Sequence, residues 1–400
     1  MKKMSLTTLK ETFMKKGPLY EPAGIYIHIP FCMSKCSYCD FFSITDLSFK
    51  KEFISALNRE IILSPGKHLK FDSLYIGGGT PSILPAEAIS RIIDNTAAAF
   101  NLDSSAEITM EANPATLNRE NLKEFKMAGI NRLTLGIQSF HCKNLKFLGR
   151  LHSGKEAVYA VELARKCGFE NINIDLIYGI PGQTKKMWLK DLQQGVNLSP
   201  THFSCYMLTF EPGTKMEERL QKKIFRPMPE SEICNLMNAT TSFLISKGYL
   251  RYEISNYALG NNCSDYRSRH NRKYWSSVPY IGLGPSAHSF IEPARYENIS
   301  SVKEYIKSLK KGELPVIGKE LLNKNQRMTE EILLGLRKTD GLNLVIFNQK
   351  FNTDFLKKFH EPIRTLEKLK FIQTNKNRCK LTNQGILYHN SIAAMLTEFE

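Results

Sequence analysis

The sequence predicts an α/β protein: a parallel sheet, either open or curled into a partial barrel, followed by a smaller, mostly helical C-terminal domain. From about residue 24, short β-branched or aromatic runs alternate with longer amphipathic runs. Strands that alternate with helices pair in parallel, because each helix returns the chain to the same edge of the sheet. Beyond about residue 210 the alternation stops, and from about residue 313 the chain is lysine-rich with helical spacing. A length of 400 residues suits one large domain with an appendage.

Six strands and five helices make up the predicted core. The strand-like runs lie at 25–29, 73–76, 107–111, 132–137, 171–177 and 203–208. The helix-like runs between them lie at 49–64, 85–100, 119–128, 155–167 and 184–198. In parallel sheets of this kind, the loops at the carboxyl ends of the strands carry the chemistry. We therefore expect the functional residues to follow the strands.

We divide the chain into an N-terminal tail (1–23), a core (24–210), a connecting region (211–312) and a C-terminal domain (313–400). The connecting region holds a helix at 229–247 and a stretch at 251–290 that is rich in aromatic residues, Asn, Ser and Gly and includes a loop around residues 270–275. The C-terminal domain has helix-like runs at 329–337 and 352–369, a hairpin at 371–381 and a last helix. This order suggests a winged-helix-like module, which serves packing more often than nucleic-acid binding.

Net charge and cysteine content indicate which partners and which cellular compartment to expect. The formal net charge of +16 favours anionic partners: nucleic acid, a lipid surface or a polycarboxylate ligand. A lysine-rich solvated surface explains it equally well. The N-terminus lacks the apolar run of a secretory signal, and no apolar run approaches the roughly 20 residues of a membrane span. These features predict a cytoplasmic protein, in which scattered cysteines stay reduced.

Three of the nine cysteines form one motif: Cys32, Cys36 and Cys39, on a loop directly after the first strand. A structural zinc site needs four ligands, and His28 is the only nearby candidate for the fourth. A [4Fe–4S] cluster held by three thiolates instead leaves one iron open. The amine and carboxylate of S-adenosylmethionine (SAM) can chelate that iron, and one electron from the cluster can then cleave the sulfonium bond. The motif favours iron–sulfur with SAM, with zinc as the alternative.

Polar residues follow three further strands. Glu111, Gln138 and Asp175 come at or near the ends of the third, fourth and fifth strands, and a glycine run with Thr80 follows the second. Consecutive glycines let the backbone approach a small ligand, although a tight turn explains them equally well. Each polar residue alone is more often structural. Together, above a cluster loop on the first strand, they describe one ligand pocket.

These motifs resemble the radical SAM superfamily, in particular its coproporphyrinogen-oxidase-like branch, from about Gly24 to the C-terminus. The resemblance implies a partial (β/α)6 barrel of the TIM type. It implies that Tyr26 packs at the cluster and SAM, and that Tyr38 lies beside the adenine. It places Gly78, Gly79 and Thr80 against the methionyl group. It also assigns SAM contacts to Glu111, Gln138, Arg150 and Asp175. No residue is assigned a catalytic role.

Two groups share this architecture: the oxygen-independent coproporphyrinogen III oxidase and a heme-chaperone group. The oxidase pattern adds a cysteine two positions after the third, where this chain has Phe41. The oxidase also carries a longer segment ahead of the cluster. Both departures favour the chaperone group, whose expected ligands are the cluster, SAM and heme.

A second motif agrees with the chaperone group. The chain reads His-Asn-x-x-Tyr-Trp from His270 to Trp275, which resembles a signature of that group. A histidine can ligate heme iron, aromatic rings can stack on a porphyrin, and the basic residues Arg269, Arg272 and Lys273 can pair with propionates. In the alternative reading, His270 only caps the backbone of an aromatic-packed loop. His288 is a weaker candidate ligand.

We therefore expect a heme chaperone that transfers heme to apoproteins such as membrane-bound respiratory enzymes. Peripheral membrane contact and a homodimer fit this function. The oxidase itself is the enzymatic alternative. A radical SAM enzyme acting on RNA is disfavoured, because the sequence has no second cysteine cluster and no recognised RNA-binding motif, so no nucleic acid is expected as a partner.

Overall fold

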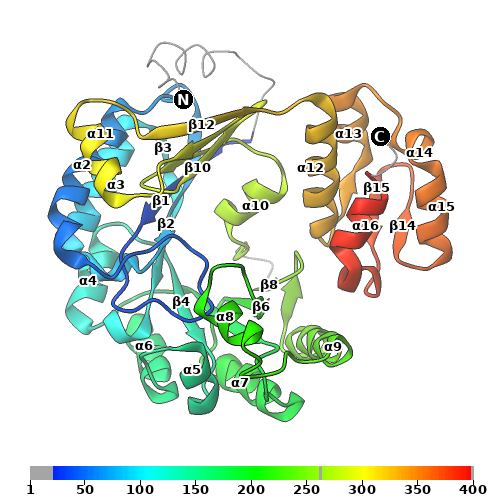
Figure 1. Cartoon of the computed structure of the whole chain (residues 1–400), viewed down its shortest axis with the longest axis horizontal. Helices are drawn as coiled ribbons and strands as arrows, with labels where there is room; N and C mark the ends of the chain where they lie inside the picture. Colours follow the sequence, from blue (N-terminus) through cyan, green and yellow to red (C-terminus); the bar gives the residue numbers. More distant parts are fainter. Residues whose placement is uncertain (1–20, 261–263, 398–400) are drawn as a thin grey trace.

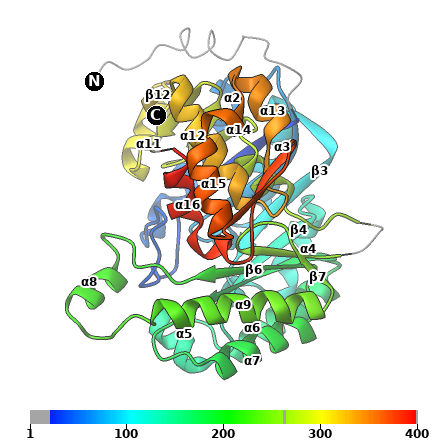
Figure 2. The same cartoon turned by 90° about the vertical axis from the view of Figure 1, so that its right-hand side faces the viewer.

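The computed structural model describes residues 21–260 and 264–397. Most of the predicted tail (1–23) and Cys263 lie outside the described residues. A 12-stranded sheet runs through the molecule in the order β12-β11-β10-β9-β1-β2-β3-β4-β5-β6-β8-β7. A separate group of helices at the C-terminal end packs beside it (Figures 1 and 2).

The centre of the sheet is parallel, and helices follow its strands. Each of the neighbouring pairs from β1 to β6 is parallel. The strands are β1 Ala23–Ile29, β2 Lys70–Gly78, β3 Asn101–Ala112, β4 Arg132–Gln138, β5 Asn171–Tyr178 and β6 His202–Met207. The helices are α2 Lys50–Leu63, α3 Ala86–Ala99, α4 Arg119–Met127, α5 Cys142–Leu148, α6 Gly154–Lys166, α7 Lys185–Asn197 and α8 Lys215–Gln221. The predicted α/β class with a partial (β/α)6 barrel is confirmed.

Burial explains why these runs form a parallel sheet. Strands β1 and β5 are buried at nearly every position, as expected where helices cover one face and the barrel interior lies on the other. The helices bury one stripe each; in α3 it includes Ile89, Ile92 and Ile93. Short 3-10 turns complete the loops, at Leu47–Phe49, Pro81–Ile83, Pro114–Thr116 and Gly385–Tyr388.

The connecting region extends the sheet at both ends, so the barrel stays open. On one side β9 (Tyr280–Leu283) pairs parallel with β1, and β10 (His288–Ile291), β11 (Ala294–Asn298) and β12 (Val316–Leu321) continue antiparallel. On the other side β8 (Asn256–Leu259) and β7 (Tyr249–Arg251) continue from β6. The remaining helices of this region are α9 Glu230–Ser246 and α11 Val302–Lys310.

A buried carboxyl ties α2 to this extension. The side chain of Glu60 is 2% exposed and accepts hydrogen bonds from Gly284 N (2.7 Å), Asn298 Nδ2 (2.6 Å) and Tyr305 Oη (2.5 Å). Its donors come from the β9–β10 connection, β11 and α11. One side chain thus fixes three segments that are more than 200 residues away in sequence.

The C-terminal helices form a domain with its own hydrophobic core. The helices are α12 Lys324–Arg337, α13 Leu344–Phe351, α14 Phe355–Lys358, α15 His360–Lys368 and α16 His389–Met395. A three-stranded antiparallel sheet, β13 Leu342–Asn343, β15 Arg378–Leu381 and β14 Ile372–Thr374, completes the domain. Because β12 belongs to the large sheet, we propose a domain boundary after Leu321 rather than at residue 313.

Two predicted elements differ from the structure. The run 352–369, expected as one helix, is broken between α14 and α15; Pro362 lies in the first turn of α15, where its missing N–H costs nothing. The motif at 270–275, expected as a loop, lies on helix α10 (Arg269–Trp275), whose first turn is capped by Ser268. Within the described residues, no helix combines the length and the apolar character of a membrane span.

Candidate functional site

The three clustered cysteines lie on a loop that leaves the carboxyl end of β1. Hydrogen bonds close the loop at its base, where Cys32 N donates to Ile44 O (3.0 Å) and Ile44 N donates to Pro30 O (2.7 Å). The other two cysteines are joined by a turn in which Cys39 N donates to Cys36 O. All three line one cavity of about 1020 Å³ at the end of the barrel.

The donor set fits an iron–sulfur cluster better than a single metal ion. The three cysteines are free. Across residues 21–260 and 264–397, no three Cys, His, Asp or Glu side chains meet around one ion-sized point. His28 is buried and uses both ring nitrogens, Nδ1 with Tyr26 Oη (3.1 Å) and Nε2 with Phe42 O (2.8 Å). A cubane cluster distributes its thiolates over different irons, so it requires no such convergence.

The surroundings of the thiols also suit a positively charged partner. Burial raises the pKa of the Cys39 thiol to about 11. Its thiolate therefore needs a counter-charge, which iron supplies. Arg150 Nη1 lies 3.3 Å from Cys36 Sγ, and Thr80 Oγ1 lies 3.5 Å from Cys32 Sγ.

The glycine run at the end of β2 lies directly on the base of the cysteine loop. Gly79 N donates to Ile29 O (2.8 Å), and a Cβ at Gly79 would lie only 2.6 Å from Phe31 O. Gly78 has a φ of +107°, a region that favours glycine. Close backbone contact therefore explains these glycines, and both residues also line the cavity.

Two half-buried carboxyl groups face the cavity from β3 and β5, which lie on either side of β4. Glu111 accepts from Tyr75 Oη (2.7 Å) and Gly78 N (3.1 Å), and burial raises its pKa to about 7. Asp175 accepts from Asn173 Nδ2 (2.7 Å), and burial raises its pKa to about 6. In the described part of the chain, neither forms an ion pair with a Lys or Arg. Both can therefore receive a cationic group of a ligand.

Gln138 and Arg150 reach the same cavity from β4 and the segment after α5. Gln138 has a φ of 67°, unusual for a residue other than glycine, and lies at a register shift between β4 and β5. Arg150 Nη2 donates to Gly136 O (2.6 Å). The irregular end of β4 thus directs a carboxamide, and Arg150 a guanidinium, towards the cysteines.

The aromatic residues are arranged differently from the expectation. Tyr38 lines the cavity, but Tyr26 does not. Tyr26 packs beside Tyr75, with ring centroids 6.2 Å apart, and Tyr75 lines the cavity instead. Sequence reasoning missed Tyr75, although it lies two residues before Gly77 of the glycine run, and residues two apart on a strand project from the same face.

The far wall of the cavity comes from the other end of the chain. Residues Leu387, Tyr388, His389, Asn390 and Ser391 line it together with the cysteine loop. His389 is buried and uses Nε2 with Leu333 O (2.8 Å) and Nδ1 with Asn390 Oδ1 (2.9 Å). No sequence motif marks this contact between the C-terminal domain and the barrel, so sequence reasoning missed it.

Comparison with known proteins identifies two known domains in the chain. The family model described as the radical SAM superfamily matches residues 26–194, and that of the HemN C-terminal domain matches residues 322–388. Among solved structures, the coproporphyrinogen III oxidase (HemN) of Escherichia coli has the same fold: its TM-score is 0.84 at 22% identity, with 98% of this chain and 94% of that chain covered.

Curated relatives match over almost the whole chain. The heme chaperone HemW of Lactococcus lactis is 34% identical, over 94% of this chain and 97% of its own. HemW of Bacillus subtilis is also 34% identical, over 92% and 97%. HemW of Escherichia coli is 36% identical, over 67% and 70%.

The chain belongs to the HemW family of radical SAM proteins. The radical SAM family implies a [4Fe–4S] cluster and SAM, and the chain has residues suited to both. Cys32, Cys36 and Cys39 would hold the cluster, and Glu111 and Asp175 would receive the positively charged groups of SAM. When bound, cluster and SAM together supply reductive cleavage of the sulfonium bond. The protein's own part is to hold the thiolates, orient the ligand and seal the barrel end.

The HemW-type motif residue His270 lies on the inner side of α10, away from solvent. It is buried; its Nδ1 lies 3.2 Å from Ser73 Oγ and its Nε2 2.8 Å from Tyr274 Oη. Its ring packs 5.3 Å from that of Tyr75, and burial lowers its pKa to about 3. Both ring nitrogens therefore have protein partners, and an iron would have to displace one of them. His288, the weaker candidate, is exposed on β10.

Proposed function

We propose that the protein is a heme chaperone, which binds heme and transfers it to apoproteins. The observation that carries this proposal is the match to proteins named heme chaperone HemW over nearly the full length of both chains. The match includes the C-terminal domain as well as the barrel, so it is not confined to the part shared with other radical SAM proteins.

The cysteine loop supports the chaperone over the oxidase. The position where the oxidase pattern has a fourth cysteine is occupied by Phe41, which is 67% exposed at the rim of the cavity. A phenyl ring cannot ligate iron, but it adds apolar surface for a flat ligand. The cluster loop of this chain therefore lacks the additional thiol of the oxidase pattern.

We further propose that the chaperone acts in the cytoplasm, as a homodimer, and delivers heme to membrane-bound respiratory enzymes. The excess of positive charge supports contact with an anionic membrane surface. Binding to anionic vesicles that weakens as salt is added would agree with this contact, and no difference between anionic and neutral vesicles would exclude it.

The proposed function is tested by anaerobic titration of the reconstituted protein with heme, followed by its Soret absorption, and by transfer of that heme to an apoprotein. We expect saturable binding of one heme per chain. Featureless, non-saturating absorption would contradict the proposal. Conversion of coproporphyrinogen to protoporphyrinogen with consumption of SAM would instead establish the oxidase.

The role of His270 is tested in the same titration. If His270 ligates the iron, His270→Ala weakens binding and shifts the Soret band. An unchanged spectrum would restrict His270 to packing against Ser73 and Tyr274. The variant Ser73→Ala is a useful control, because it removes one hydrogen bond of His270 and leaves the imidazole in place.

A further inference from the structure

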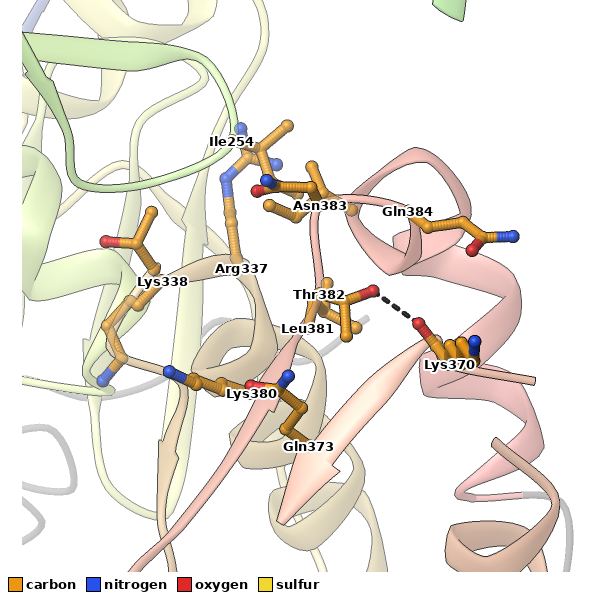
Figure 3. A pocket seen from close by; sticks show the side chains of 12 residues that line it. Ile254, Arg337, Lys338, Lys370, Gln373, Lys380, Leu381, Thr382, Asn383 and Gln384 are labelled. Atoms are coloured by element: carbon orange, nitrogen blue, oxygen red, sulfur yellow. Dashed lines mark hydrogen bonds between the residues drawn. The ribbon is translucent and has the colours of Figure 1, made fainter. Parts of the chain in front are cut away.

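A cleft between the barrel side of the molecule and the C-terminal domain holds two further cavities, the smaller of which shares Ile254, Arg337 and Ile386 with the cysteine cavity and so adjoins it. The larger, about 1390 Å³, lies between α10, β7 and β8 on one side and α12 and α13 on the other. The smaller, about 530 Å³, faces the sheet of the C-terminal domain. Figure 3 shows the smaller cavity. Lys338 and Thr339 line both cavities, so the two adjoin.

Most of the acidic residues in this cleft are already paired. The ion pairs are Asp265 with Arg267 (2.7 Å) and Arg272 (3.3 Å), Glu292 with Arg327 (2.6 Å), and Glu331 with Lys350 (2.9 Å). No acidic residue lines the smaller cavity. The charge that remains after pairing is therefore predominantly positive.

Besides Lys370, which also lines the smaller cavity, three cations contribute to this remaining charge: Lys338, Arg378 and Lys380. Arg378 and Lys380 alternate on β15 with the buried Cys379 and Leu381, so both project from the outward face of the sheet. Lys380 lies opposite Gln373 of β14, and Figure 3 shows it in the same cavity as Lys338. Within the described residues, none of the three cations forms an ion pair with a carboxylate.

The electrostatics of Lys338 agree with this arrangement. Its Nζ lies 3.3 Å from Ser276 Oγ, a neutral partner. Burial lowers the pKa of Lys338, and the charge of Arg378 acts in the same direction, while the carboxylates of Glu331, Glu21 and Asp340 oppose it. Clustered cations of this kind are stabilised by an anion that sits between them.

A second, independent feature of the cleft also lacks a partner. The indole Nε1 of Trp275 is buried and has no hydrogen-bond acceptor, although its ring lies against the Arg337 guanidinium at 4.3 Å. Trp275 lines the larger cavity. A buried donor without an acceptor is unfavourable, and an acceptor group on a ligand would relieve this cost.

We propose that Lys338, Arg378 and Lys380 form a binding site for an oxyanion group of a ligand that occupies this cleft. A carboxylate and a phosphate share the chemistry that these side chains recognise. Two sources are therefore distinguished below: free phosphate, and the propionates of heme. The second source rests on the proposed heme-binding function, whereas the first does not.

The test uses the reconstituted full-length protein and the double variant Arg378→Gln/Lys380→Gln. The matched control is Arg364→Gln/Lys368→Gln, which removes the same two charges from exposed positions of α15 that line neither cavity. Binding of inorganic phosphate is measured by calorimetry at low salt, and binding of heme by its Soret absorption. Both variants are first shown to melt like the unmodified protein.

The site is supported if the cleft variant binds phosphate or heme about tenfold more weakly than the control, as expected for two partly solvated charge-assisted contacts. Weakening of both ligands, with phosphate competing against heme, identifies the heme propionates as the occupant. Weakening of phosphate alone identifies a free phosphate. If both ligands bind the cleft variant and the control equally, the proposal is wrong. If the unmodified protein does not bind heme, the proposed function is wrong. The phosphate titration then still decides whether the cleft holds an oxyanion site.

Discussion

Cys36 gives a direct test of the cluster ligands at the residue scale. It lies in the middle of the motif, half exposed, with Arg150 beside its sulfur. Replacing Cys36 with Ser removes one thiolate, so we expect the [4Fe–4S] absorption to be lost after anaerobic reconstitution. Iron and sulfide content provide a second measurement. Cys142→Ser, an exposed cysteine outside the loop, is the control. Full cluster content in Cys36→Ser would refute the ligand assignment.

We expect Glu111 to make SAM binding depend on pH. Burial raises its pKa to about 7, and that of Asp175 to about 6. A cationic group of SAM attracts only the ionised carboxylates, so affinity should rise between pH 6 and pH 8 and weaken as the pH falls. Calorimetry at both pH values measures this change. In Glu111→Gln the affinity at pH 8 should be lower and its pH dependence smaller; an identical pH profile in the variant would contradict this role.

The sequence predicts the positions of some residues around the cavity but not of others. The positions of Glu111, Gln138 and Asp175 follow from strand ends, because parallel strands deliver successive polar residues to one edge. The place of Arg150 was expected only from the family resemblance. The exchange of Tyr26 for Tyr75 at the cavity was not predicted, because it depends on how one aromatic ring packs behind another.

At the scale of elements, the buried Glu60 on α2 should make stability fall with rising pH. Burial raises its pKa to about 7, above the ordinary value of 4.5. Because the folded protein binds this proton more tightly than the unfolded chain does, Glu60 adds about 3 kcal/mol to the free energy of unfolding below pH 4.5. This contribution is lost as the pH rises through about 7. Melting temperatures at pH 5 and pH 8 should differ less in Glu60→Gln than in the unmodified protein. Glu52→Gln, exposed on the same helix, should leave the difference unchanged.

The secondary structure was predictable where periodicity is strong. Strands β1 to β6 and the helices between them lie within a few residues of the expected runs, apart from α5, which is only seven residues long. Helix α10 was missed for a similar reason: it has seven residues, and its aromatic and polar side chains show no apolar stripe. Its start depends on the Ser268 cap and on packing against β2.

At the scale of the whole molecule, Arg337 connects the two domains. Its Nε lies 2.7 Å from Oε2 of Glu253, a fully buried carboxylate of the core. Removing the guanidinium in Arg337→Met leaves Glu253 unpaired, which should destabilise the docked state by about 3 kcal/mol. Thermal melting and limited proteolysis between the domains measure the loss. Arg364→Met is the exposed control, and Glu253→Gln combined with Arg337→Met should recover part of the stability.

The arrangement of the two domains was the feature that could least be predicted from the sequence. The sequence indicates a C-terminal helical module, but the contact of Leu387–Ser391 with the cysteine cavity joins positions more than 300 residues apart. Such contacts are specified by complementary surfaces, which leave no periodic pattern in either segment. For the same reason, the ion pair between Glu253 and Arg337 could not be predicted from the sequence.

The walls of the cysteine cavity run from Cys32, near the start of the described chain, to Ser391, near its end. During synthesis the barrel strands therefore emerge and pair long before the segment that closes the cavity leaves the ribosome. Until then the cysteine loop faces an open cavity mouth, through which iron and sulfide can be loaded. We therefore expect the cysteine loop to be more accessible to iron and sulfide before α16 docks than after it.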